Sequence, residues 1–241
     1  MIYSKVTLKL HWGFAVSHPI KARAKPSYLL PPPTTLIGAL SYGAFRGLDS
    51  DFLGEYVGSP AYKLQSKIKG AFASFSKDFS GTYIEDIVRN VTYYYERYKD
   101  RSHWYNVVPT GKVYSPGQEI KVVYLADSLS SGELARLSWS IVRLGCKECL
   151  VSVKDVEIGE AKEVKGKIAT PYYFPADVKL LSSPLSVIIV DFWDYNGYLW
   201  GKRAGWVKYA IPNPGFPLLR NEVEVDAKLA YQVGDEYVVL S

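Results

Sequence analysis

The sequence predicts an α+β fold, with a β-α-β-β-α-β unit over residues 1–160 and an all-β region over 161–241. Two observations predict it. Segments that alternate like half-buried strands and segments with apolar stripes at helical spacing follow one another in that order. After about residue 160, every patterned segment reads as strand. The order of the first unit is that of ferredoxin-like, or RRM-like, domains.

The first strand, helix and connecting loop come from residues 3–45. Residues 3–10 alternate well enough for a half-buried strand, and a basic loop follows from about 17 to 30. Three prolines at 31–33 disfavour helix before them and favour it after them, and Thr34 or Thr35 can serve as N-cap. The apolar stripe of this helix is Leu36, Ile37, Leu40 and Ala44. Its small residues, which would allow close approach to a sheet, are Gly38, Ala39 and Gly43.

The remaining elements follow from residues 66 to 193. Residues 66–76 and 82–95 are rich in β-formers, and 89–118 reads as a protruding, thumb-like segment with turn signals at PTG and SPG. Strand 119–126 precedes a helix that is capped by Ser130 or Ser131 and ends at Gly145. Strands then follow, among them SVIIVDFW at 186–193.

Composition indicates a globular protein of 241 residues, with 48% hydrophobic and 22% charged residues. No apolar run approaches the length of about 20 residues that a membrane span needs, so we expect no membrane partner. The N-terminal residues lack the apolar block and cleavage site of a signal peptide. Two cysteines provide no disulfide framework. We therefore expect a cytoplasmic protein.

Positive charge is concentrated at the N-terminal end. Residues 1–48 hold six Lys or Arg and no acidic residue, whereas the chain as a whole carries +5. Clustered Lys and Arg favour a polyanionic partner because binding releases phosphate counterions. Taken alone, the same cluster is also typical of a solvated face.

Residues suited to catalysis or to metal binding form no recognisable site. His11, His18 and His103 stand in no nucleophile–base motif. Cys146 and Cys149 resemble half of a zinc or redox site, but no further zinc ligands appear at suitable spacing, so we expect ordinary residues at the start of a strand. We expect no catalytic residue, no metal and no cofactor.

An aromatic and basic segment at 92–105 favours RNA. Aromatic faces stack on splayed bases while basic side chains contact phosphates. An edge strand with half-buried tyrosines is an equal alternative for this segment alone. Its candidate RNA-binding residues are Arg97, Lys99, Arg101, His103 and Trp104, with Lys112 beyond it.

A second candidate surface lies where the basic loop meets the first helix. Hydroxyls and free backbone N–H groups at a helix start suit a phosphate. Thr34 and Thr35 supply them; plain capping is the alternative role, and it does not exclude a phosphate. The neighbouring cations are Lys21, Arg23 and Lys25.

The stretch SYLLPPPTTLIGALSYGAF at 27–45 resembles the N-terminal signature of the Cas-five family, and RLGCKECLVSV at 143–153 is similar to a second family segment. These are RAMP-superfamily subunits of type I CRISPR surveillance (Cascade) complexes. The resemblance covers about residues 1–160. The chain is short and has one Met against 20 Tyr, a composition compatible with a thermophile, which suggests the type I-A branch.

The resemblance implies a role in antiviral defence. The chain would grip the 5′ handle of the guide RNA (crRNA) through the basic loop, Thr34 and Thr35. It would cap the filament of Cas-seven subunits, with 89–112 as a thumb, and help to seat the large subunit that examines target DNA.

Two other functions stay open. One branch of the family cleaves precursor RNA with Tyr, Lys and His; Tyr42, His103 and Lys112 have the right chemistry for such a metal-independent endoribonuclease. A scaffold that contacts only protein is the other alternative. We expect a non-catalytic RNA-binding subunit.

Exchange of the basic-loop charges tests this expectation. Arg23→Glu with Lys25→Glu should weaken RNA binding and flatten its salt dependence, since each phosphate contact on a single strand adds about 0.7 to the slope of log K against log salt. Filter binding across a salt series measures that slope. An unchanged slope would exclude the basic loop from the RNA contact.

Overall fold

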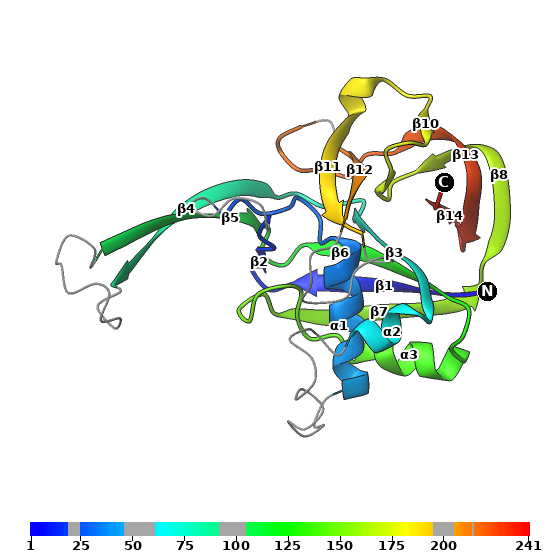
Figure 1. Ribbon diagram of the computed structural model, residues 1–241, viewed down its shortest axis with the longest axis horizontal. Coiled ribbons are helices and arrows are strands. Elements are labelled where there is room, and N and C mark those ends of the chain that lie inside the picture. Colours follow the sequence, from blue (N-terminus) through cyan, green and yellow to red (C-terminus); the bar gives the residue numbers. More distant parts are fainter. Residues whose placement is uncertain (19–24, 46–60, 92–104, 195–204, 214) are drawn as a thin grey trace.

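The chain folds into a mixed, mostly stranded structure with few helices (Figure 1). The computed structural model describes residues 1–18, 25–45, 61–91, 105–194, 205–213 and 215–241. An α+β fold with mostly β C-terminal residues, as the sequence predicts, is therefore observed. No helix within those ranges is long and apolar enough to cross a membrane.

A four-stranded antiparallel sheet forms the centre of the structure, in the order β3-β6-β1-β7. Val6 lies in the middle of this sheet, opposite Val122 on one side and Val156 on the other. The predicted strand at 119–126 is confirmed as β6. The four strands are β1 (Ile2–Leu10), β3 (Ile68–Phe75), β6 (Glu119–Ala126) and β7 (Val151–Glu160).

Two helices cover one face of this sheet. Helix α1 (Pro33–Phe45) packs on β3, and α3 (Ser131–Trp139) packs on β1 and β7 while touching α1. A short helix, α2 (Tyr62–Gln65), lies between α1 and β3. Tyr124 of β6 is fully buried and donates a hydrogen bond to the carbonyl of Leu36 (2.9 Å), which holds the start of α1 on the sheet.

Helix α3 begins as predicted but ends early. Ser130 accepts a hydrogen bond from the backbone N–H of Glu133, whose carboxylate accepts from the N–H of Ser130 in return, so a capping box fixes the start. The helix ends at Trp139 and not near Gly145. Ile141 and Leu144 are nevertheless buried, because the irregular chain after the helix still packs into the core.

Two expectations for α1 are wrong. The helix begins at Pro33, whose fixed φ suits a first helical position, so Thr34 and Thr35 lie inside its first turn and are not its N-cap. Gly38 does not pack closely on the sheet, since a Cβ there would meet nothing within 4 Å. Gly43 is the tight position, where a Cβ would lie 2.1 Å from Oγ of Ser140 at the end of α3.

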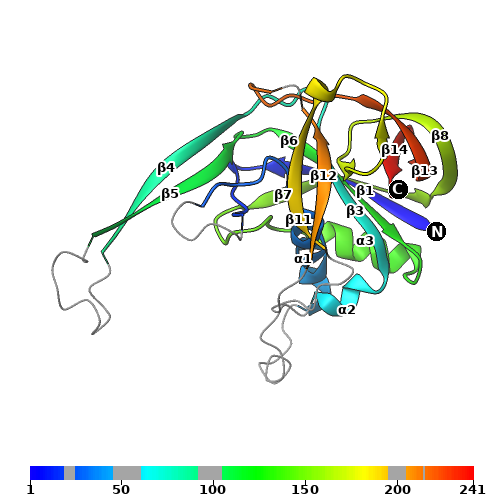
Figure 2. The ribbon, with the colours of Figure 1, turned by 45° about the horizontal axis from the view of Figure 1, so that its top comes forward.

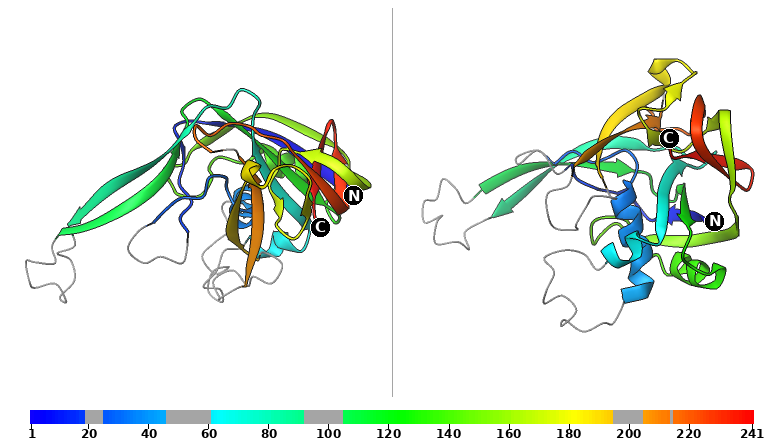
Figure 3. Two further views of the ribbon diagram at one scale, coloured as in Figure 1. Left: turned by 90° about the horizontal axis from the view of Figure 1, so that it is seen from above. Right: turned by 45° about the vertical axis from the view of Figure 1, so that its right-hand side comes forward.

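A two-stranded ribbon is inserted between β3 and β6 and projects from the body (Figure 3, left). It consists of β4 (Thr82–Val91) and β5 (Tyr105–Tyr114), paired from Thr82↔Tyr114 outward. The short strand β2 (Gly13–Phe14) pairs with the root of β5. The sequence placed a protruding segment at 89–118; PTG at 109–111 proves to be strand and not turn, whereas Gly117 does lie in a turn with positive φ.

The C-terminal residues form two further sheets beside the central one (Figure 2). The long strand β13 pairs with β8, β10 and β14, and β11 pairs with β12, which pairs with β9. The predicted strand at 186–193 is confirmed as β11. The strands are β8 (Lys162–Thr170), β9 (Phe174–Pro175), β10 (Lys179–Leu180), β11 (Val187–Trp193), β12 (Trp206–Pro212), β13 (Val223–Val233) and β14 (Glu236–Val239), with a 3-10 turn at Pro184–Ser186.

One hydrophobic cluster joins the central sheet to the C-terminal sheets. Tyr173, which is fully buried, contacts Phe72 of β3 and also Phe192 and Tyr209 of β11 and β12. Its hydroxyl donates to the carbonyl oxygens of Pro31 (3.2 Å) and Ala71 (3.1 Å). The two regions predicted at 1–160 and 161–241 therefore share one hydrophobic core.

A buried carboxylate makes a second link between the sheets. Glu236 of β14 is 6% exposed and accepts hydrogen bonds from Lys121 of β6 (3.0 Å), Arg220 (2.9 Å) and the Tyr172 hydroxyl (2.7 Å). Burial alone would raise the pKa of Glu236, but these three donors outweigh it and hold the pKa below its ordinary value. The ionised form is thus the one that the fold stabilises.

The cysteine expectation is wrong. Cys146 and Cys149 are joined by a disulfide in the turn between α3 and β7, with their Cα atoms 5.4 Å apart. That distance lies within the range that disulfides allow. In this state neither sulfur is available as a zinc ligand.

The buried carboxylate predicts how stability depends on pH. A lowered folded-state pKa adds stability at pH values above the unfolded-state pKa, and that stability is lost as pH falls through the folded value. Glu236→Gln should therefore lower the free energy of unfolding by about 3 kcal/mol near neutral pH, and the difference from the wild type should shrink below about pH 4. Urea unfolding at several pH values measures both.

Glu222→Gln is the matched control, because Glu222 contacts the same Arg220 (2.6 Å) but is half exposed. It should cost less than about 1 kcal/mol. Equal effects of the two substitutions at pH 7 would contradict the assignment of Glu236 as the link between the sheets.

Candidate nucleic-acid interface

Both ends of the predicted basic loop are tied together at the root of the projecting ribbon. Ser17 and Ser27 form a bridge, the N–H of His18 donates to the carbonyl of Pro26 (2.9 Å), and that of Tyr28 donates to Val16 (2.9 Å). The loop is therefore closed at its base, before and after residues 19–24, which lie outside the described residues.

The second end of the loop also pairs with β5. The N–H of Lys25 donates to the carbonyl of Pro109 (2.9 Å), and the N–H of Gly111 donates to the carbonyl of Lys25 (2.8 Å). Its backbone is thereby fixed beside Thr110 while the residue itself is exposed. Of the three predicted basic-loop cations, Lys25 is the one that the structure describes, and it is held at the ribbon root.

A crowded contact joins this loop to both strands of the ribbon. The Tyr83 hydroxyl of β4 accepts a hydrogen bond from the N–H of Ser27 (3.3 Å) and donates one to Glu85 (3.3 Å). A Cβ at Gly111 would lie 2.2 Å from that hydroxyl and 2.4 Å from the Ser27 nitrogen. The close approach therefore requires glycine at 111. We call the contact of Ser27, Tyr83 and Gly111 the root junction.

Tyr28 extends the same assembly to the C-terminal part. Its ring stacks on His18 with centroids 3.8 Å apart and contacts Phe192 edge-on. Its hydroxyl donates to the carbonyl of Asp191 in β11 (2.7 Å). Burial, aided by the Asp191 charge, raises the pKa of Tyr28 far above its ordinary value, so the hydroxyl stays a donor.

The threonines predicted to meet phosphate are less accessible than expected. Thr34 is only 8% exposed and Thr35 is half-buried. The N–H of Thr35 already donates to the carbonyl of Pro32 (2.9 Å). The first turn of α1 thus lies close to the root junction in sequence, but its Thr34 side chain belongs to the interior.

Lys112 lies on β5 next to the root junction and is engaged in an ion pair. Its Nζ is 2.8 Å from Oδ2 of Asp86 on β4, and this hydrogen bond lowers the pKa of Asp86. A phosphate at this position would have to compete with that carboxylate. A role of Lys112 in RNA cleavage would likewise require the lysine to leave this acidic partner.

Several residues of the predicted RNA-binding set lie outside the described residues, so their positions relative to the root junction stay predictions. They are Lys21, Arg23, Arg97, Lys99, Arg101, His103 and Trp104.

The ribbon itself exposes apolar side chains that the sequence analysis did not single out. Ile84 and Ile87 are 38% and 60% exposed, and their odd spacing puts them on opposite faces of β4. Phe216, 62% exposed, packs beside Tyr83 at the root. A two-stranded ribbon cannot bury both of its own faces, so this one is suited to contact with partners.

The sequence offered signals for some of the missed residues. Gly111 stands between alternating residues of a strand, a position that marks a bulge or a close backbone approach. The roles of Ser27, Tyr28 and Tyr83 depend on contacts across 56 or more residues of sequence or with β11. No local pattern indicates such contacts.

Comparison with known proteins places the chain among CRISPR proteins. No protein-family model matches it. Over the full length of both chains it is 53% identical to "CRISPR system aCascade subunit Cas5 1" and 54% identical to "CRISPR-associated protein Cas5 3", both of Saccharolobus solfataricus.

Solved structures share the fold. A CRISPR protein from Archaeoglobus fulgidus superposes with a TM-score of 0.65 at 22% identity, covering 99% of both chains. A chain of a CRISPR RNA-guided surveillance complex superposes with a TM-score of 0.51 at 10% identity, covering 91% of both. With identity above half over the whole length of curated relatives, the chain belongs to the Cas-five family of CRISPR-associated proteins.

Proposed function

We propose that this chain is a non-catalytic subunit of a Cascade-type surveillance complex that holds the 5′ handle of the guide RNA and caps the Cas-seven backbone. The observation that carries the proposal is the root junction, where the second end of the basic loop meets both strands of the projecting ribbon, while Ser17 closes the loop against Ser27. The printed name of a relative, an aCascade subunit, supports the complex. Such a subunit would work in the cytoplasm and act on target DNA only through its large partner subunit.

The fold proposal is a ferredoxin-like unit over residues 1–160. If the ribbon is set aside, β1, β3, β6 and β7 are the first, second, third and fourth strands of this unit in chain order. Their antiparallel arrangement β7-β1-β6-β3 and the two helices on one face support this assignment. The ribbon β4–β5 is then an insertion between the second and third strands.

Charge and shape at the ribbon root support single-stranded RNA as the ligand. Exposed Lys25 lies within the acid-free N-terminal segment and supplies positive charge for a phosphate chain at the ribbon root. Of the two carboxylates there, Asp86 is already paired with Lys112, which leaves Glu85 as the like charge that a phosphate would meet. The apolar faces of the ribbon would contact the first Cas-seven copy, since protein partners cover apolar surface. Specificity for the handle would come from splayed bases read at their edges.

The absence of catalysis is part of the proposal. Acid–base cleavage needs an acid and a base within hydrogen-bond reach of the reacting oxygens. Of the three residues considered for cleavage, Lys112 is paired with Asp86, and Tyr42 lies on α1, which packs on β3 and α3. His103 lies outside the described residues.

A gel experiment tests binding and cleavage together. End-labelled RNA with a 5′ repeat handle, or with a scrambled one, is mixed with the protein in EDTA, with and without the Cas-seven subunit. We expect handle-dependent retention of intact RNA. Metal-independent cutting that His103→Ala abolishes would replace the proposal by a nuclease. Equal retention of both RNAs would refute handle recognition, and retention of neither would leave a protein-only scaffold.

The charge control for this experiment lies in the C-terminal sheet. Lys162→Glu with Lys165→Glu reverses two exposed cations of β8, the same change in net charge as Arg23→Glu with Lys25→Glu. We expect it to change handle affinity less than about threefold. Comparable losses for both pairs would mean that net charge, and not the basic loop, governs binding.

The root junction makes a separate prediction. Gly111→Ala places a Cβ against the Ser27 backbone and should weaken handle RNA binding about tenfold or more, because the loop must move away from β5. Gly132→Ala, where a Cβ meets nothing within 4 Å, is the control. Melting curves identify general unfolding; wild-type affinity in a folded Gly111→Ala protein would contradict the role of the junction.

A further inference from the structure

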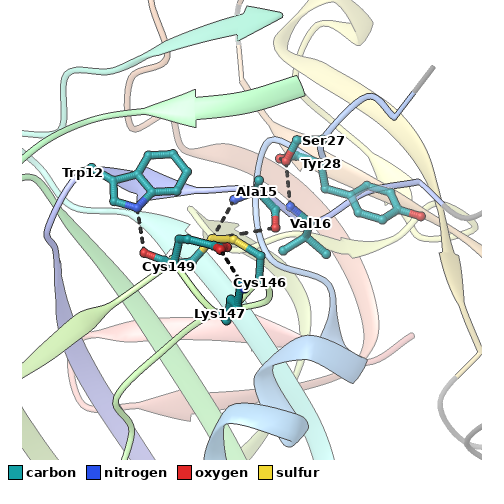
Figure 4. The surroundings of a disulfide bond; sticks show 9 residues. Trp12, Ala15, Val16, Ser27, Tyr28, Cys146, Lys147 and Cys149 are labelled. Carbon is teal, nitrogen blue, oxygen red and sulfur yellow. Dashed lines mark hydrogen bonds and ion pairs between the residues drawn. A yellow bond between two sulfur atoms is a disulfide. The ribbon is translucent and has the colours of Figure 1, made fainter. Parts of the chain in front are cut away.

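The disulfide lies directly beneath the segment that leads into the basic loop (Figure 4). Cys149 is fully buried and Cys146 is half-buried in the turn between α3 and β7. The N–H of Ala15 donates a hydrogen bond to Sγ of Cys149 at 3.2 Å. One sulfur of the pair is thus part of the surface on which residues 11–16 rest.

Other atoms of the same turn hold the same segment. The indole N–H of Trp12 donates to the carbonyl of Glu148 (2.8 Å), and the N–H of His11 donates to that of Leu150 (3.3 Å). A Cβ at Gly145, which has a positive φ of 80°, would lie 2.7 Å from Cγ2 of Val16. The turn therefore contacts the segment at both of its ends.

The supported segment continues without interruption into the root of the ribbon. Gly13 and Phe14 form β2, which pairs with β5, and the N–H of Val16 donates to Oγ of Ser27 (2.9 Å). Figure 4 shows Ser27 and Tyr28 beside Val16. Any loosening of the turn at 145–150 would reach the base of the basic loop through this one segment.

We propose that Cys146–Cys149 is a reversible redox site that braces residues 11–16 and thereby sets the affinity of the basic loop for guide RNA. The inference rests on the proposed function for its RNA part. Its structural part, the brace, depends only on the contacts of the turn.

Sequence spacing and burial favour a reversible site over a purely stabilising one. The two cysteines are three positions apart, and so short a ring removes little entropy from the unfolded chain. C-x-x-C pairs are the spacing in which thiols are commonly reactive. Here one sulfur is within reach of solvent and the other is buried, so attack at Cys146 is favoured.

The reaction requires a dithiol reductant. Its thiolate attacks Sγ of Cys146, the S–S bond breaks, and the electron pair passes to Sγ of Cys149, whose thiolate Ala15 N–H stabilises before it is protonated. The second thiol of the reductant then attacks its own sulfur in the mixed disulfide and releases Cys146 as a thiol. Two electrons and two protons reach the protein, and the reductant leaves as a disulfide.

Reduction removes the constraint that fixes the turn. The sulfurs are no longer held at the bonding distance of about 2.05 Å, so the buried Cys149 thiol and the Cys146 side chain must repack. The hydrogen bonds from Ala15 and Trp12 to this turn then lose their fixed acceptors. We expect the segment to open locally while the sheets stay folded.

The experiment compares the full chain in three states: air-oxidised, reduced with a dithiol, and reoxidised. Cys146→Ser with Cys149→Ser provides a permanently open turn, and Lys147→Ser is the control in the same exposed turn. Alkylation counts free thiols, hydrogen exchange follows residues 11–16 and 28, and handle RNA binding is measured on the same samples. Melting curves show whether each form is folded.

We expect no free thiol in the oxidised protein. Reduction should speed exchange in 11–16 by about tenfold and weaken RNA binding by about fivefold, and reoxidation should reverse both. The double serine variant should match the reduced protein, and Lys147→Ser should match the oxidised one.

Three results would overturn the inference: free thiols in the oxidised protein, unchanged exchange on reduction, or changed exchange with unchanged RNA affinity. In a fourth case, reduction speeds exchange in residues 11–16, but the oxidised protein binds no handle RNA in the first place. That result would refute the proposed function and the RNA part of the inference, and would support the brace. The two failures are thereby distinguished.

Discussion

The arrangement of the molecule depends on one buried carboxylate. Glu236 has three donors from three places in the chain, Lys121 on the central sheet and Tyr172 and Arg220 on the connections of the C-terminal part. A carboxylate in the interior is tolerated only when its hydrogen bonds are made, so the sheets can pack in one relative position. Tyr173 makes a further link, because its hydroxyl donates to the carbonyls of Pro31 and Ala71 and its ring contacts Phe192 and Tyr209.

The fixed position of the C-terminal part determines the surroundings of the basic loop. Tyr28 reaches Asp191 and Phe192 of β11, so the loop base rests on the C-terminal sheet on one side and on the ribbon root on the other. The disulfide turn lies below it. Three parts of the chain that are distant in sequence thus converge on a segment that has little regular structure of its own.

Much of the fold could be predicted from local patterns. The strand at 119–126 and the Ser130 cap follow from a short run of β-forming residues and from capping chemistry, which act over a few residues. The N-terminus of α1 could not be assigned between Pro33 and the threonines, because proline at a first helical position and threonine at an N-cap are both favourable. The helix begins at Pro33, and Thr34 is buried within its first turn, a placement that depends on tertiary packing.

The candidate site was predicted less completely. The basic loop and the ribbon could be identified from charge and aromatic content, but their meeting at Ser27, Tyr83 and Gly111 could not, because it depends on pairing across more than 50 residues. The disulfide was missed for a similar reason: two cysteines at this spacing suit a metal, a free pair or a bond, and only the turn geometry separates them.

The projecting ribbon also acts as a lever. Strand β4 has ten residues, so at about 3.3 Å per residue the ribbon tip lies about 30 Å from its root. A rotation of 10° at the root therefore moves the tip by about 5 Å, more than the spacing between neighbouring strands. The few contacts around Gly111 consequently fix the direction of the whole ribbon, and small changes there are magnified at the far end of its described strands.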